Sequence, residues 1–247
     1  MLIKNKNTVI TGCNRGIGKK ILEVFSMNGA NVFACVRKID DQFLSHVKSL
    51  ERKAKNKIIP IQLNLDDDSQ IKEAANKILS ENKPIDILIN NAAIIHTAIF
   101  QMTSIKKLKE VFETNFFGQS NFTQYILKSM VKNKKGSIIN ISSSSALDGN
   151  EGRSAYSASK NALIAQTKVL SRELGSNNIR VNVIAPGLTN TDMMKKNTPQ
   201  KVVDDVLSKV SLKRVADPEE IANVALLISS DLSSYITGQV IRVDGGM

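Results

Sequence analysis

Short apolar runs alternate with longer amphipathic stretches along the whole chain. Seven runs rich in isoleucine and valine predict strands at Thr8–Thr11, Asn31–Val36, Ile58–Leu63, Ile85–Ile89, Ser137–Ile141, Arg180–Ile184 and Val240–Val243. Most of these runs lack the polar–apolar alternation of a strand with one face in water. Their continuous apolar character is typical of strands covered on both faces in a parallel sheet.

Six amphipathic segments lie between these runs and predict helices at Gly18–Asn28, Asp41–Ala54, Ser69–Glu81, Ser104–Lys132, Ala155–Leu174 and Pro218–Ser230. Alternating strands and helices predict an α/β fold: a single doubly wound, Rossmann-type domain over residues 1–247, with a parallel seven-stranded sheet and helices on both faces. The segment Asp192–Arg214 contains no strand. It predicts a helical insertion, at about residues 192–214, that covers a substrate site.

Composition fits a globular domain, with 42% hydrophobic and 23% charged residues. No apolar run approaches the roughly 18 residues that a membrane span requires, and the polar start does not resemble a signal peptide. We therefore expect a cytoplasmic protein with no membrane segment. Cys13 and Cys35 lack metal-site spacing and are expected to be reduced thiols. His46 and His96 are the only histidines, so we expect no metal site.

The formal net charge is +11, with lysines scattered along the chain. A solvated basic surface explains this charge, and an acidic partner or an anionic substrate is the alternative interpretation. No motif or aromatic platform supports nucleic-acid binding.

A glycine-rich turn, Thr11–Gly18, follows the first predicted strand and opens the first predicted helix. Glycines permit a tight turn and close approach of the backbone to a ligand. The start of the helix offers free N–H donors and partial positive charge to a pyrophosphate. The turn therefore predicts a dinucleotide site. Its spacing, Gly-x-x-x-Gly-x-Gly, differs from the usual dinucleotide fingerprint.

This spacing resembles that of the short-chain dehydrogenases, and the resemblance extends over essentially the whole chain. Further motifs occur in family order: Asn90–Ala93 (with Ala93 where the family has glycine), Asn115, Ser143, the Tyr-x-x-x-Lys pair Tyr156 and Lys160, Pro186–Gly187, and the closing segment Ile236–Gly246. Within the family, the chain is most similar to bacterial 3-oxoacyl-(acyl carrier protein) reductases.

The resemblance implies catalytic roles for Ser143, Tyr156, Lys160 and Asn115. Tyr156 and Lys160 are four residues apart, which places both on one face of a helix. A nearby ammonium would lower the tyrosine pKa from its usual value near 10. Ser143 would hydrogen-bond the substrate carbonyl oxygen, although Ser142 and Ser144 are neighbouring alternatives. Asn115 resembles the asparagine that holds a water linking the lysine to solvent.

The second predicted strand ends at Arg37 and Lys38, with no carboxylate before Asp40. An arginine here attracts a ribose 2′-phosphate, which a carboxylate would repel. Together with Arg15, this predicts NADP(H) as cofactor. The resemblance implies these cofactor-binding residues: Gly12, Asn14, Arg15, Gly16, Ile17, Gly18, Arg37, Asn64, Leu65, Asn91, Ala92, Ala93, Tyr156, Lys160, Pro186, Gly187, Thr189 and Thr191. Asn64 stands where the family often has aspartate.

Three functions compete. The first is reduction of 3-oxoacyl groups on acyl carrier protein, with Lys134 and Arg172 facing the acidic carrier. The second is reduction or oxidation of a small ketone, sugar or nucleotide-sugar, for which the cationic Arg153 could bind an anionic group. The third is a catalytically silent binding protein, which the intact Ser143, Tyr156 and Lys160 disfavour. The family resemblance also implies a homotetramer in which the Ser104–Lys132 and Ala155–Leu174 helices pair between subunits.

Overall fold

Seven parallel strands form one sheet in the computed structural model, which describes all 247 residues. The order across the sheet is β3-β2-β1-β4-β5-β6-β7. The strands are β1 (Asn7–Thr11), β2 (Asn31–Val36), β3 (Ile58–Gln62), β4 (Ile87–Asn90), β5 (Gly136–Ile141), β6 (Ile179–Pro186) and β7 (Val240–Val243). All seven predicted strands are confirmed, and their bounds agree within two residues.

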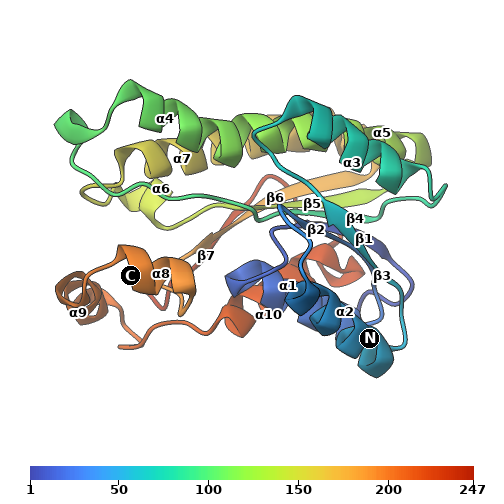
Figure 1. The fold of residues 1–247 in the computed structure, drawn as a ribbon, viewed down its shortest axis with the longest axis horizontal. Coiled ribbons are helices and arrows are strands. Elements are labelled where there is room, and N and C mark those ends of the chain that lie inside the picture. Colours follow the sequence, from blue (N-terminus) through green and yellow to red (C-terminus); the bar gives the residue numbers. More distant parts are fainter.

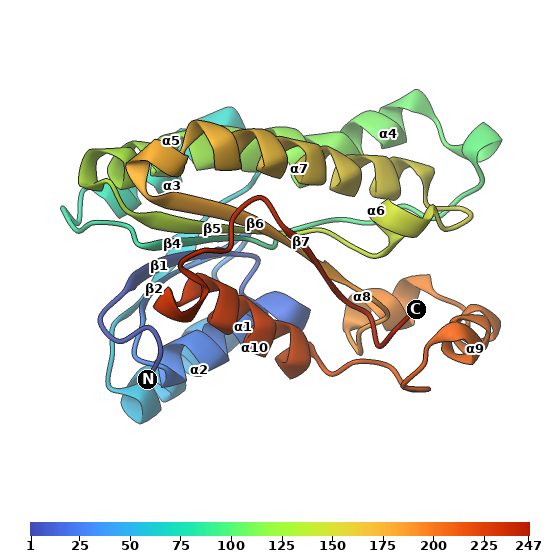
Figure 2. The ribbon, with the colours of Figure 1, turned by 180° about the vertical axis from the view of Figure 1, so that it is seen from behind.

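Helices cover both faces of this sheet, as predicted (Figure 1). One face carries α1 (Gly16–Met27), α2 (Asp41–Ala54) and α10 (Pro218–Ser229). The other carries α3 (Asp68–Leu79), α4 (Ile105–Phe112), α5 (Gly118–Asn133) and α7 (Ser154–Glu173). Three short helices, α6 (Ser145–Asp148), α8 (Asp192–Asn197) and α9 (Gln200–Lys209), lie toward one end of the sheet, as the reverse view in Figure 2 shows.

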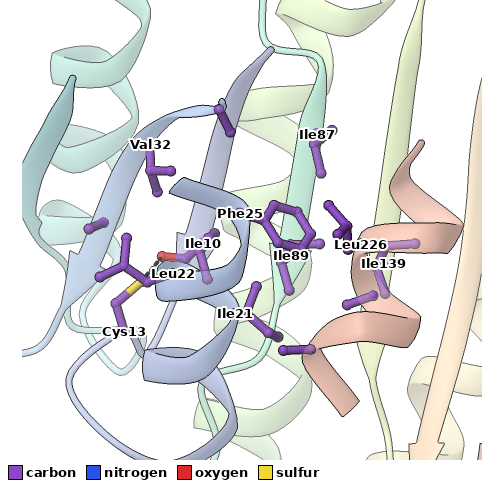
Figure 3. Close-up of a cluster of buried hydrophobic side chains, with 14 of the residues drawn as sticks. Ile10, Cys13, Ile21, Leu22, Phe25, Val32, Ile87, Ile89, Ile139 and Leu226 are labelled. Atoms are coloured by element: carbon purple, nitrogen blue, oxygen red, sulfur yellow. Dashed lines mark hydrogen bonds between the residues drawn. The ribbon is translucent and has the colours of Figure 1, made fainter. Parts of the chain in front are cut away.

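The sheet has a hydrophobic cluster on each face, which accounts for the continuous apolar runs in its strands. In the first cluster, Phe25 and Leu22 of α1 and Leu226 of α10 pack against Ile10 and Ile89 of the central strands (Figure 3). Each of these side chains is buried. Burial of such side chains supplies about 1.5–3 kcal/mol each.

The connections reverse direction at the centre of the sheet. Strand β1 pairs with β2 on one side and with β4 on the other. The chain therefore leaves β1 toward one edge of the sheet and returns at β4 to build the other. A crevice forms outside the carboxyl ends of the strands at such a switch point, and ligands bind there in open α/β sheets.

The single helix predicted at Ser104–Lys132 is wrong in one respect. A π-helical segment, Glu113–Phe117, separates α4 from α5. The amphipathic pattern continues through this segment, so periodicity alone does not reveal the change from α- to π-helix. Gly118 follows it and passes so close to Leu65 that an added Cβ would overlap the Leu65 carbonyl oxygen.

The predicted insertion is helical and comprises α8 and α9. Helix α6 and a 3₁₀ turn at Phe100–Met102 were not predicted, because segments of three or four residues are too short to show periodicity. No helix combines the length and apolar character required to cross a bilayer. Cys13 and Cys35 are free and buried, and burial raises the pKa of both thiols.

Candidate active site

A cavity of about 540 Å³ lies at the carboxyl ends of the strands. The β1–α1 turn, the ends of β2, β4, β5 and β6, helix α7 and the α8–α9 insertion all contribute to its wall. All the sequence-predicted site residues except Asn64 and Asn115 line this one cavity. The structure thus brings together residues that are up to about 180 positions apart in the chain.

The glycine turn forms the floor at one end of the cavity. Gly12 and Gly16 have φ of +74° and +54°, left-handed conformations that favour glycine. A Cβ on Gly18 would overlap the Gly12 carbonyl oxygen. Arg15, at the N-cap of α1, makes no side-chain cap bond, and the first turn contains no acidic residue. The first N–H groups of α1 therefore remain free to bind an anion. A dinucleotide pyrophosphate is such an anion.

Arg37 lies at the end of β2, on the cavity wall, with a side chain that is 60% exposed. Its Nη2 is 3.4 Å from Oδ2 of Asp66, whose other oxygen accepts a hydrogen bond from Thr114. Such an exposed ion pair is weak, so the guanidinium is available to a phosphate. Asn64 does not line the cavity, and its Oδ1 accepts from the Asp66 N–H at 3.4 Å.

The hydrogen bonds of the serines that follow β5 show which of them lies beside Tyr156. The Ser142 hydroxyl donates to the Lys160 carbonyl oxygen at 2.9 Å, and the Ser145 hydroxyl pairs with a serine hydroxyl of α7 at 2.6 Å. The Ser143 hydroxyl is close enough to Tyr156 to lower the tyrosine pKa, and its Oγ accepts from the Ser145 N–H at 3.2 Å. Ser143 is therefore the serine that stands beside the tyrosine.

The electrostatics around Tyr156 differ from the sequence-based expectation. Burial raises the tyrosine pKa, against smaller lowering effects from the Ser143 hydroxyl and the Arg153 charge. Lys160 is 1% exposed, its Nζ donates to the Ile141 carbonyl oxygen at 2.7 Å, and burial lowers its pKa to about 7. In this structure the lysine does not lower the tyrosine pKa. Its ammonium is directed at a backbone carbonyl, and its own charge is disfavoured by burial.

Asn115 lies in the π-helical segment and is fully buried behind the cavity wall. Its side chain accepts from the Ile94 N–H and donates to the Ile94 carbonyl oxygen, both at 2.9 Å, and it donates to the Ser159 hydroxyl at 3.0 Å. These bonds join the loop after β4 to helix α7. A π turn at a functional site is a recurrent feature of helices.

The cavity end beyond Tyr156 has an apolar lining that was not predicted residue by residue. It consists of Ile94, Ile95, Leu188, Met193, Met194, Val202, Val206 and Met247. The insertion supplies four of these side chains. The i, i+4 spacing of Val202 and Val206 is the signal in the sequence that could have found the inner face of α9.

Arg153 lines the same end of the cavity, three residues before Tyr156. Its Nη1 donates to the Thr97 hydroxyl at 2.7 Å. Its Nη2 donates to the Asn197 carbonyl oxygen at 2.8 Å and to the Thr198 hydroxyl at 3.2 Å. No carboxylate pairs with this guanidinium.

Residues 12–247 match a family model described as enoyl-(acyl carrier protein) reductase. The chain is 39% identical to the 3-oxoacyl-[acyl-carrier-protein] reductase FabG of Thermotoga maritima, covering 100% of this chain and 99% of that protein. It is 38% identical to FabG of Chlamydia muridarum, with 100% and 98% covered. It is also 37% identical to a 3alpha-hydroxysteroid dehydrogenase of Mediterraneibacter gnavus, with 99% and 98% covered.

A solved structure described as a short chain dehydrogenase/reductase family protein superposes with a TM-score of 0.85 at 30% identity. The alignment covers 100% of this chain and 98% of that one. The chain therefore belongs to the short-chain dehydrogenase/reductase family, and it is an oxidoreductase that acts on CH–OH and C=O groups with a nicotinamide cofactor.

Proposed function

We propose that the chain, as a single cytoplasmic domain, uses NADPH to reduce the 3-keto group of an acyl chain carried by acyl carrier protein. The observation that carries this proposal is the Ser143–Tyr156 hydroxyl pair, which stands between a dinucleotide-fitting turn and an apolar pocket. Full-length similarity to several 3-oxoacyl-[acyl-carrier-protein] reductases supports the substrate class.

The proposed roles follow from the positions of the side chains. NADPH, when bound, supplies the hydride for the carbonyl carbon. The Ser143 hydroxyl donates a hydrogen bond to the carbonyl oxygen and stabilises its developing negative charge. Tyr156, protonated at neutral pH because burial raises its pKa, gives its proton to that oxygen. Lys160, on the cavity wall, would bind the nicotinamide ribose, and Asn115 fixes the loop after β4.

The glycine turn with Asn14, Arg15 and Ile17 would hold the pyrophosphate, and Arg37 the 2′-phosphate. Leu65, on the cavity wall, would lie near the adenine, whereas Asn64 precedes it in the chain and does not line the cavity. The nicotinamide end would contact the residues after β4 and β6, namely Asn91, Ala92, Ala93, Pro186, Gly187, Thr189 and Thr191.

Changing Arg37 to aspartate is expected to reverse the cofactor preference. Wild type should prefer NADPH, and Arg37→Asp should lower kcat/KM with NADPH by about 10–100-fold, because a charge-assisted phosphate contact is replaced by repulsion. Steady-state kinetics with NADPH and NADH measure the change. Arg52→Asp on α2, an exposed site outside the cavity, is the charge-matched control. Equal use of NADH by wild type would contradict the assignment of Arg37.

A homotetramer is proposed because the outer surface of the α4, α5 and α7 layer exposes large apolar side chains. Ile105, Phe117, Val131 and Val169 are 67%, 53%, 38% and 53% exposed. Phe122, in contrast, is fully buried in the core. Light scattering at micromolar concentration should give four times the monomer mass. A monomer would contradict this assembly.

Assembly also bears on how a carrier protein would dock. Arg172 follows Tyr156 by sixteen residues on α7, so it lies about 24 Å away along the helix. Lys134 caps the corresponding end of the neighbouring α5. In a two-fold pair with antiparallel long helices, these basic ends of one copy would lie toward the cavity of the other.

Reversing both charges, Lys134→Glu with Arg172→Glu, should raise the KM for a carrier-bound 3-oxoacyl thioester about tenfold or more. The effect should grow steeply at low salt, since surface charges act through association. A small free ketone should be used as by wild type. Lys48→Glu with Arg52→Glu, on α2, is the matched control. If the carrier substrate were indifferent to the first pair, the docking surface would lie elsewhere.

A small ketone is the second candidate, favoured by the full-length similarity to a 3alpha-hydroxysteroid dehydrogenase and by the apolar pocket. A panel of NADPH oxidation assays with a 3-oxoacyl thioester, a steroid ketone and an anionic ketosugar separates the two candidates. Faster use of the steroid or the sugar than of the thioester would replace the first proposal.

A further inference from the structure

The guanidinium of Arg153 joins three segments that are distant in the sequence. Arg153 belongs to the turn between α6 and α7, Thr97 to the connection after β4, and Asn197 and Thr198 to the junction between α8 and α9. All three segments meet at the substrate end of the cavity, beside Tyr156.

The acceptors around Arg153 are all neutral. Two are threonine hydroxyls, and the third is the carbonyl oxygen of Asn197, the last residue of α8. The last carbonyls of a helix have no partner within the helix. The guanidinium therefore satisfies a backbone acceptor that would otherwise depend on water.

These bonds have no counterpart on α8 and α9, although the end of the insertion is tied to the C-terminal segment through Ser211 and Leu212, which bond Gly246 and Gly245. Residues 192–209 make no other hydrogen bond or ion pair to any residue outside the segment 188–217. The junction between α8 and α9 is therefore held over the cavity by apolar contacts and by the Arg153 side chain. The turn that carries Arg153 is itself fastened to the β4 connection, since the Ala98 N–H donates to the Gly152 carbonyl oxygen at 3.0 Å.

We propose that Arg153 is a latch, a positioning residue that holds the α8–α9 insertion closed across the substrate end of the cavity. Admission of substrate requires the bonds to Asn197 and Thr198 to break, and closure re-forms them. When the latch is closed, Met193, Val202 and Val206 line the cavity that contains Tyr156 and limit the access of water to it. The latch rests on the proposed function only for the identity of the substrate that it admits.

Backbone amide hydrogen exchange tests the latch without any substrate. Arg153→Gln should raise the exchange rate of residues 192–209 by about tenfold or more, because bonds from a charged donor are lost. Arg153→Lys should raise it as well, since an ammonium lacks the planar fork that spans separate acceptors. Thr198→Val removes one acceptor and keeps the charge, so a smaller rise is expected. Lys196→Gln, exposed on α8, is the charge-matched control and should leave exchange unchanged.

Kinetics separate the latch from a role of Arg153 in binding an anionic substrate. For a latch, Thr97→Val combined with Thr198→Val should reproduce part of the fall in kcat/KM seen in Arg153→Gln, with the Kd for NADPH unchanged. Unchanged exchange at residues 192–209 in Arg153→Gln would overturn the latch. A loss of activity in Arg153→Gln that the double valine variant does not share would also overturn it. If exchange rises as expected but 3-oxoacyl thioesters are not reduced, the latch stands and the proposed substrate fails.

Discussion

Tyr156→Phe is expected to lower turnover by about 10²–10⁴-fold while the cofactor still binds, the usual contribution of general acid–base catalysis. The variant keeps the aromatic ring in the cavity wall and removes only the hydroxyl beside Ser143. Stopped-flow or steady-state oxidation of NADPH measures turnover, and cofactor fluorescence measures binding.

Tyr125→Phe makes the same chemical change outside the site. Tyr125 lies on α5, packs against the core and receives the Lys128 ammonium at 5.1 Å from its ring centroid. This control should retain wild-type turnover. Near-normal turnover in Tyr156→Phe would remove the tyrosine from the mechanism, and loss of cofactor binding would assign it a binding role instead.

The raised pKa of Tyr156 also sets the pH range in which each direction of the reaction can be catalysed. A protonated hydroxyl is ready to donate to a carbonyl oxygen at neutral pH, whereas alcohol oxidation requires the phenolate as base. Reduction should therefore proceed at neutral pH, and oxidation should gain as pH rises toward the tyrosine pKa.

The strand pattern was predictable because the strands are covered on both faces. Runs such as Asn31–Val36 are apolar at nearly every position, and a short run of this kind, rich in valine, is typical of a strand in a parallel sheet. The glycine turn was predictable for a similar reason, since a Cβ at Gly18 cannot be accommodated. Where packing leaves few choices for a residue type, the sequence carries a readable signal.

The π-helical segment and the latch were not predictable, because each depends on contacts between distant segments. Asn115 is oriented by the Ile94 backbone and Ser159, and nothing near it in the sequence indicates either partner. The position of Arg153, three residues before Tyr156, predicts a cation near the site, and Arg153 does line the cavity. Its partners at Thr97 and Asn197 emerge only once the insertion has folded over the cavity.

The electrostatic expectation for Lys160 failed for a related reason. Spacing placed the lysine on the same helix face as Tyr156, but spacing does not report how deeply a side chain is buried. Burial lowers the lysine pKa to about 7, so at neutral pH a large fraction of Lys160 is uncharged. A group kept in such an environment costs folding stability, as functional groups often do.

Replacing Lys160 by methionine should therefore stabilise the fold at neutral pH, although it should abolish most activity. An unfolded lysine titrates near 10.5 and the folded one at about 7, so the unfolded chain holds more protons between these values. The penalty from Lys160 is complete below pH 7 and declines as pH rises toward 10.5. The free energy of unfolding of Lys160→Met minus that of wild type should thus fall by up to about 1.4 kcal/mol per pH unit above pH 7.

Urea unfolding at pH 7, 8 and 9 and at one protein concentration measures this difference, since oligomer stability depends on concentration. Below pH 9 the buried thiols and Tyr156, whose pKa values are raised, stay protonated in both proteins and cancel. Lys168→Met, at an exposed position of the same helix, should show no such slope. Methionine also leaves the Ile141 carbonyl oxygen without its donor, which subtracts a constant of about 1–3 kcal/mol but does not change the slope. A difference that is flat from pH 7 to 9 would mean that Lys160 keeps its proton when folded, and its ammonium would then be available to lower the tyrosine pKa after all.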